Sequence, residues 1–196
     1  MFDQLHEYMN SNNLLSKYQS GFRPSHSTTT AVINVTDEWL KSFDNGEITG
    51  VVMLDLKKAF DTVNFDVLIR KLMLYGADSN SNEWFTSYLQ DRSHITLVNG
   101  NSSSSVPIRC GVPQGSILGP LLFIIYINDL PNHVFNCKVS RYADDTALYY
   151  SCKDANELAR VINADLINVT NWLNNNKLNI NIKKTEELYW VPNRGY

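Results

Sequence analysis

The spacing of apolar and polar residues predicts a helix and then a strand near the start of the chain. Residues 27–43 carry apolar side chains near helical spacing, Ser27 can cap the start of this helix, and Gly46 follows as a stop signal. The period then changes, because residues 48–54 form a continuous apolar, β-branched run that is typical of a buried strand. This predicted strand ends next to Asp55.

Further helices and a ribbon are predicted in the middle of the chain. The expected elements are helices at 64–74 and 82–89, a two-stranded ribbon at 95–98 and 106–109, and an apolar helix at 120–129. Asn99-Gly100 is a turn signal within the ribbon. Pro120 suits the first residue of the apolar helix, because its ring fixes φ near the helical value.

The last part of the chain predicts a hairpin, a long helix and a final strand. The expected elements are strands at 138–142 and 146–151, an amphipathic helix that begins at Asp154, and a strand at 187–191. The two acids Asp144 and Asp145 then lie at the tip of the hairpin. The order of elements indicates an α+β fold, with an antiparallel sheet and helices packed on one face of it.

Composition argues against several classes of protein. The longest apolar stretch, residues 121–127, is far shorter than the roughly 20 residues that a membrane span needs, so no membrane partner is expected. No basic and then apolar run opens the sequence, which predicts an intracellular protein without distinguishing nucleus from cytoplasm. Cys110, Cys137 and Cys152 lack Cys-x-x-Cys spacing, which argues against a zinc site or a disulfide framework.

The charge balance limits how the chain can bind nucleic acid. There are 17 Lys and Arg residues against 20 Asp and Glu residues, a net charge of -3, and the basic residues are dispersed. Proteins that grip nucleic acid through its phosphates usually show a basic stripe. Tight independent binding to a duplex is therefore not expected from this chain.

Asp55, Asp144 and Asp145 are candidates for a metal site. Phosphoryl transfer to a nucleotide uses two divalent ions about 3.5–4 Å apart, and Mg²⁺ prefers oxygen ligands. Acids at a strand end and at a hairpin tip can supply such ligands if the two places meet in the fold. Taken alone, each of these acids is more often an ordinary turn residue, so the interpretation depends on their joint occurrence.

Several segments resemble, in order, the palm motifs of reverse transcriptases. They are the run from Val51 to Asp61, the run from Gly111 to Pro120, Tyr142-Ala143-Asp144-Asp145, and Asn181 with Lys184-Thr185. The second of these, together with Gln19-Ser20-Gly21-Phe22-Arg23, is most similar to the non-LTR (LINE-type, jockey-like) retrotransposon branch. The resemblance covers nearly the whole chain. It implies an RNA-directed DNA polymerase that extends a DNA primer on an RNA template, using deoxynucleoside triphosphates.

The resemblance also implies which groups would bind metal. Asp55 and Asp144 would be the principal ligands of two Mg²⁺ ions, for which Mn²⁺ is a possible substitute. The backbone carbonyl of Leu56 would complete one site, and Asp145 would be the supporting acid. Because adjacent residues on a strand face opposite ways, the two acids of the pair cannot have equal roles.

The same resemblance implies five substrate-binding residues. Phe60 would be a steric gate against the 2′-hydroxyl of a ribonucleotide, although a core aromatic is the alternative. Gln114 and Gly115 would lie beside the incoming nucleotide and the template base, and their alternative is an ordinary turn into a helix. Lys184 would lie near the pyrophosphate, with a solvated turn as the alternative. Arg23 would contact the template, because a guanidinium suits phosphate recognition.

The expected organisation is a partial fingers segment at 1–44 and a palm at 45–196. A thumb and the remaining fingers strands of the family are not found in this sequence. Two functions stay open: an RNA-directed DNA polymerase, or a truncated, catalytically inactive retroelement remnant that persists as an inert product or an interaction module. A nuclease with the same two-metal chemistry is poorly supported, because no nuclease pattern accompanies the acids.

Overall fold

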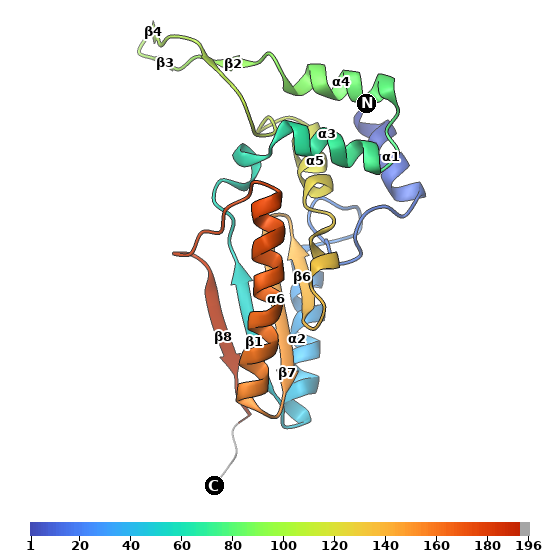
Figure 1. Ribbon diagram of the computed structural model, residues 1–196, viewed down its shortest axis with the longest axis vertical. Coiled ribbons are helices and arrows are strands. Elements are labelled where there is room, and N and C mark those ends of the chain that lie inside the picture. Colours follow the sequence, from blue (N-terminus) through green and yellow to red (C-terminus); the bar gives the residue numbers. More distant parts are fainter. Residues whose placement is uncertain (193–196) are drawn as a thin grey trace.

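An antiparallel sheet forms the centre of the protein (Figure 1). The computed structural model describes residues 1–192, so residues 193–196 of the expected palm lie outside the described part. The sheet has four strands in the order β6-β7-β1-β8, and every neighbouring pair is antiparallel. Its strands are β1 (Ile48–Leu54), β6 (Lys138–Tyr142), β7 (Asp145–Cys152) and β8 (Glu186–Trp190).

Two helices, one before and one after the β6–β7 hairpin, connect the strands of this sheet. After β1 the chain passes through α5 (Leu118–Tyr126) to the β6–β7 hairpin, and then through α6 (Ala155–Asn175) to β8. The first strand, β1, therefore lies in the interior of the sheet, between β7 and β8. This is the β-α-β-β-α-β order of ferredoxin-like folds.

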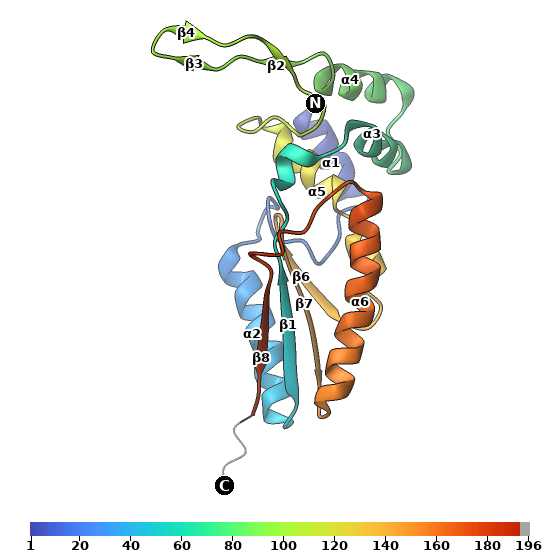
Figure 2. The ribbon, with the colours of Figure 1, turned by 60° about the vertical axis from the view of Figure 1, so that its left-hand side comes forward.

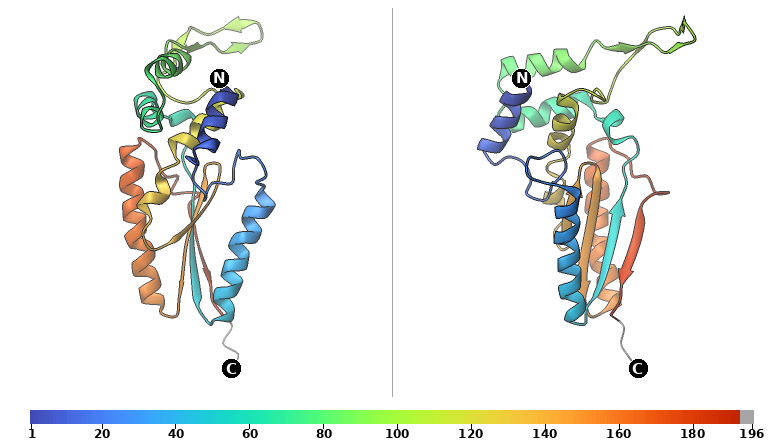
Figure 3. Two further views of the ribbon diagram at one scale, coloured as in Figure 1. Left: turned by 90° about the vertical axis from the view of Figure 1, so that its right-hand side faces the viewer. Right: turned by 180° about the vertical axis from the view of Figure 1, so that it is seen from behind.

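Helices cover both faces of the sheet, as two views at different angles show (Figures 2 and 3). On one face α6 packs so closely that a Cβ atom added at Gly50 would lie 2.7 Å from the side chain of Ile162. On the other face α2 (Thr28–Asp44) packs Val35 and Trp39 against a small cluster that includes Val51. The α+β class and the antiparallel sheet are confirmed, but the expectation of helices on one face only is wrong.

The physical reason for this correction lies in the sequence of β1. A strand with one solvated face alternates apolar and polar residues, whereas β1 is apolar along nearly its whole length. Its residues Thr49 to Val52 are all buried. A strand of this kind requires cover on both sides, and α2 supplies the second layer.

Most of the remaining elements lie at the end of the sheet where β1 finishes (Figure 1). They are the helices α1 (Phe2–Ser11), α3 (Phe65–Leu74) and α4 (Ser79–Leu89), the 3-10 turn η1 (Ala59–Thr62), and the short strands β2 (Ser93–His94), β3 (Leu97–Val98), β4 (Asn101–Ser102) and β5 (Val106–Pro107). A second 3-10 turn, η2 (Leu130–His133), contacts α6. The short strands form an arm that projects from the body (Figure 2). Among the described residues, no helix is both long and apolar enough to cross a bilayer.

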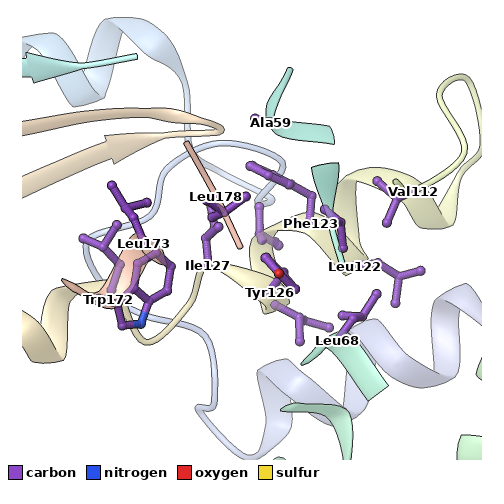
Figure 4. Close-up of a cluster of buried hydrophobic side chains, with 14 of the residues drawn as sticks. Ala59, Leu68, Val112, Leu122, Phe123, Tyr126, Ile127, Trp172, Leu173 and Leu178 are labelled. Atoms are coloured by element: carbon purple, nitrogen blue, oxygen red, sulfur yellow. The ribbon is translucent and has the colours of Figure 1, made fainter. Parts of the chain in front are cut away.

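The core gathers around α5, which is buried on nearly every side. A helix that is apolar all round belongs in an interior rather than on a surface. Figure 4 shows Phe123, Tyr126 and Ile127 of this region among side chains from other elements, including Trp172 and Leu173 of α6. This core joins α3 and α6 to the sheet and fixes the end of β1 against the loop that precedes α5.

A buried carboxylate connects α6 to the start of β6. The side chain of Asp165 is 0% exposed. It accepts backbone N–H bonds from Phe135 at 3.1 Å, from Asn136 at 2.8 Å and from Cys137 at 2.6 Å. These three residues lead directly into β6, so Asp165 fixes the entry of the hairpin strand that ends beside Asp144.

Most of the predicted elements are confirmed with small shifts in their bounds. Ser27 caps α2 and accepts a bond from the backbone N–H of Thr30, and Asn64 caps α3 in the same way. The apolar helix begins at Leu118 rather than at Pro120, because the Ser116 hydroxyl already accepts the N–H of Gly119 at 3.0 Å. Helix α1 was not predicted.

The pairing of the projecting arm differs from the prediction. Instead of one ribbon of 95–98 with 106–109, β3 pairs with β4 and β2 pairs with β5. Asn99 and Gly100 both have positive φ, 49° and 80°. A two-residue turn of this kind closes a hairpin directly, so the partner of β3 is the segment immediately after the turn.

Candidate active site

The fold brings the end of β1 and the tip of the β6–β7 hairpin together. Leu54 pairs with Thr146 in the antiparallel register of β1 and β7. One further step of that register puts Asp55 opposite Asp145. Tyr142 pairs with Asp145, which leaves Ala143 and Asp144 as the turn. The three acids therefore belong to adjacent backbone segments, although Asp55 and Asp144 are far apart in the sequence.

The charges of the three acids act on one another. The pKa of Asp145 is raised above its ordinary value, first because desolvation penalises its charged form and then because Asp144 and Asp55 repel that charge. Within residues 1–192, no group of three or more His, Cys, Asp or Glu side chains is arranged to hold a metal ion. Asp55 and Asp144 are half-buried and Asp145 is exposed, so the three acids are neighbours along the backbone but do not form a closed cage.

The segment 179–185, between α6 and β8, fixes the backbone at Asp55. The carbonyl of Asp55 accepts the N–H of Asn181 at 2.8 Å, and the N–H of Lys57 bonds to the carbonyl of Asn179 at 2.9 Å. The Thr185 hydroxyl accepts the N–H of Asp55 at 3.5 Å. Residues 179–185 therefore run directly beside the candidate metal ligand.

Leu56 and Lys184 both belong to this crossing of two segments. Leu56 forms an isolated bridge with Ile180, and its half-buried side chain packs on the core. The N–H of Lys184 bonds to the carbonyl of Asn181 at 2.9 Å, and its side chain is exposed. The structure thus brings the backbone of Lys184 close to Asp55 and leaves its ammonium group in solvent.

Phe60 has both a packed and an open side. Its ring stacks on Phe123, with centroids 4.2 Å apart and planes at 26°, and meets Phe22 edge-on at 6.1 Å. The residue is half-buried. Phe60 is therefore an aromatic anchored on the core, which is compatible with either of the two interpretations from the sequence.

The loop before α5 lies against the segment that follows β1. The side-chain amide of Gln114 donates to the carboxylate of Asp61 at 2.7 Å, and the N–H of Val112 bonds to the carbonyl of Phe60 at 2.9 Å. Gly115 has φ of +79°, and a Cβ added there would meet nothing within 4 Å. The backbone at Gly115 is therefore open to the close approach of another molecule.

The side chain of Arg23 bonds to the backbone of the loop that carries it. One guanidinium nitrogen donates to the carbonyl of Ser16 at 2.8 Å and to that of Gln19 at 3.3 Å. The side chain is half-buried. The predicted contact of Arg23 with a template stays a prediction.

Two buried polar residues at the hairpin were not predicted from the sequence. Gln19 and Arg141 are 2% and 1% exposed. The Arg141 guanidinium donates to the carbonyl of Ile127 at 2.7 Å and to the hydroxyl of Thr146 at 3.3 Å, and burial lowers its pKa to about 10. The sequence did contain a signal for the burial of Arg141. Residues two apart on a strand lie on the same face, and Val139, which is apolar and buried, is two residues before Arg141.

The family of the protein follows from comparison with known sequences. The whole chain, residues 1–196, matches the model of the family described as reverse transcriptase (RNA-dependent DNA polymerase). The chain therefore belongs to the reverse transcriptase family. The prediction of this family from the sequence is confirmed.

The relatives of known sequence include polymerases of non-LTR retrotransposons. The chain is 35% identical to a probable RNA-directed DNA polymerase from transposon BS of Drosophila melanogaster, over 93% of this chain and 21% of the relative. It is 29% identical to the RNA-directed DNA polymerase from mobile element jockey of the same organism, over 92% of this chain and 20% of the relative. The chain thus spans about a fifth of the length of these relatives.

The fold is also similar to that of solved telomerases. A telomerase from Candida tropicalis in complex with a fragment of telomeric RNA superposes with a TM-score of 0.68, at 15% identity, over 95% of this chain and 33% of that chain. A telomerase from Candida albicans gives a TM-score of 0.67 at 17% identity, over 95% of this chain and 35% of that chain. At these identities the similarity shows the fold alone, and it agrees with the predicted polymerase palm.

Proposed function

We propose that the chain is the palm, with a partial fingers segment at 1–44, of an RNA-directed DNA polymerase that extends a DNA primer on an RNA template. The observation that carries this proposal is the register of β1 and β7, which brings Asp55 opposite Asp145 and beside Asp144. Acids delivered from two separate elements to one open place are what two-metal phosphoryl transfer requires. The membership of the reverse transcriptase family supports the same reaction.

The donor groups at this place fit divalent magnesium. All candidate ligands are oxygens: the carboxylates of Asp55, Asp144 and Asp145, and the backbone carbonyl of Leu56. Mg²⁺ keeps several waters and binds through one or two carboxylates together with substrate phosphates, so an open arrangement suffices. Desolvation raises the pKa of Asp145, and the charges of Asp144 and Asp55 raise it further, so a bound cation would oppose the repulsion among the three acids.

Each candidate residue then has a distinct task. Two divalent cations, when bound, would activate the primer hydroxyl and neutralise the leaving pyrophosphate. Asp55 and Asp144 would hold these cations, and Asp145 would support them. The exposed Lys184 lies on the segment beside Asp55, from which its ammonium group could stabilise the pyrophosphate.

The substrate would be held by the loops around the acids. Gly115 offers open backbone, and Gln114 is tied to Asp61 close to Phe60, so these residues could line the site of a deoxynucleoside triphosphate. The Phe60 ring is held by Phe123 and would exclude the 2′-hydroxyl of a ribonucleotide. Arg23 would contact the RNA template through guanidinium donors that its own loop leaves unused.

Primer extension tests the proposal. The chain is incubated with a DNA primer annealed to an RNA template, deoxynucleoside triphosphates, and Mg²⁺ or Mn²⁺. The test variant is Asp144→Asn, and Asp37→Asn is the matched control, because Asp37 is an exposed acid on α2. We expect extension by the unchanged chain and by Asp37→Asn, and a loss of at least about 100-fold in Asp144→Asn.

Two other results would contradict the proposal in different ways. Equal extension by all three proteins would remove Asp144 from catalysis. No extension by any of them, with each protein folded by circular dichroism, would favour an inactive remnant or an interaction module.

A further inference from the structure

One side chain holds the turn that carries Asp144. The Gln19 side-chain oxygen accepts the N–H of Ala143 at 2.9 Å and the N–H of Gly21 at 2.8 Å. Its side-chain nitrogen donates to the carbonyl of Ala143 at 3.0 Å. Both backbone polar groups of Ala143 are therefore paired with a single buried amide.

The turn needs such support because its backbone is unfavourable. Ala143 has φ of 56°, in the left-handed region, which costs a residue with a Cβ atom roughly 1–2 kcal/mol. A hairpin with two residues in its turn usually uses Asn or Gly at positions of this kind. The bonds from Gln19 compensate for the absence of a residue that prefers this conformation.

The loop that carries Gln19 is itself fixed on the hairpin. The N–H of Arg141 bonds to the carbonyl of Tyr18 at 3.0 Å, and the N–H of Ser20 bonds to the carbonyl of Arg141 at 2.9 Å. At Gly21 the two backbones are so close that an added Cβ would lie 2.2 Å from the nitrogen of Ala143. Gln19 thus bonds to Ala143 from a loop whose backbone is fixed on β6.

We infer that Gln19 is a positioning residue, which fixes the Ala143 peptide and thereby sets the position of the Asp144 carboxylate for metal binding. The inference rests on the proposed function, because it gives the turn a task in holding the cations. Groups that orient a metal ligand without touching the metal typically change metal affinity by about 10–100-fold when they are lost. Gln19 does this through the main chain, since its three bonds go to backbone groups.

Metal affinity tests this inference without any need for polymerase activity. Gln19→Met keeps the length of the side chain and removes its hydrogen-bonding groups. Asn128→Ala is the matched control, because Asn128 is a buried amide that holds Leu14 and Ser16 of the same N-terminal segment, each at 2.7 Å, and makes no bond to the turn. Mn²⁺ binding to each full chain is measured by electron paramagnetic resonance, and Asp144→Asn identifies the binding that depends on the turn.

We expect Gln19→Met to weaken the Asp144-dependent binding of Mn²⁺ by about tenfold or more, whereas Asn128→Ala leaves it unchanged. Unchanged affinity in Gln19→Met overturns the inference. An equal loss of Mn²⁺ affinity in Gln19→Met and Asn128→Ala, in proportion to the fall in their melting temperatures, also overturns the inference, because it would indicate a general structural role.

Hydrogen exchange separates this inference from the proposed function. In the metal-free chain we expect a protected Ala143 amide, which exchanges at least about tenfold faster in Gln19→Met and stays protected in Asn128→Ala. If the unchanged chain binds Mn²⁺ no better than Asp144→Asn, the metal centre itself is refuted, and the role of Gln19 in metal binding falls with it. If the Ala143 amide is as protected in Gln19→Met as in the unchanged chain, Gln19 does not fix the turn, even where Mn²⁺ binds.

Discussion

Removal of the Asp165 carboxylate is expected to destabilise the protein strongly. Asp165→Ala deletes the acceptor of three backbone N–H groups and of the Asn136 side-chain amide, at a position that is 0% exposed. A hydrogen bond to a charged group contributes about 1.5–3 kcal/mol, and a buried donor left without an acceptor costs about 1–3 kcal/mol. Because four such donors lose their acceptor, we expect the free energy of unfolding to fall by about 4 kcal/mol.

A second acid on the same helix provides the control. Asp154 caps α6, and its side chain accepts one bond, from the N–H of Asn156. Loss of such a cap costs about 1 kcal/mol, so Asp165→Ala should be about 3 kcal/mol less stable than Asp154→Ala in urea titrations at neutral pH. Equal destabilisation by the two substitutions would falsify the role assigned to the carboxylate.

The pH dependence gives an independent check on Asp165. Burial acts to raise the pKa of its carboxyl, but the N–H donors outweigh burial, so the pKa lies below its ordinary value of 3.8. A group whose pKa is lower in the folded state contributes stability above its unfolded pKa and loses it as the pH falls toward the folded value. The unchanged chain should therefore lose more stability than Asp165→Ala as the pH falls below about 4.

Two further predictions concern the aromatic pair beside the acids. Phe60→Val should raise the incorporation of ribonucleotides relative to deoxynucleotides in an active protein, and an unchanged sugar preference would remove Phe60 from the proposed gate. Phe123 is 0% exposed and stacks on Phe60. Phe123→Ala should lower the free energy of unfolding by about 3–5 kcal/mol and shift the sugar preference in the same direction as Phe60→Val. A stable Phe123→Ala protein would contradict the packing described for the core.

Local sequence rules predicted most of the elements because each rule acts over a few residues. Strand β1 is confirmed from its apolar run, the start of α2 from its cap Ser27, and the start of α3 to within one residue. The projecting arm was mispaired, although Asn99-Gly100 was available as the signal of its turn. The second layer over the sheet was also missed, since the pattern of a buried strand does not say which segment covers it.

The candidate site was predictable only in part for a related reason. Asp55, Asp144 and Asp145 stand at a strand end and a hairpin tip, where a local pattern is visible. Gln19 lies in a loop without periodicity, and the turn that it bonds is 124 residues further along the chain. A contact of that range leaves no trace in the spacing of neighbouring residues.

Strand β1 makes one half of the candidate site much stiffer than the other. It is hydrogen-bonded on both edges, to β7 and β8, and is covered on both faces by α6 and α2. Segments of this kind open last in native proteins, whereas turns on a single support open early. Asp55 therefore directly follows a rigid strand, whereas Asp144 lies in a turn that the side-chain amide of Gln19 holds in place. Any adjustment of the two acids to each other would come from the hairpin.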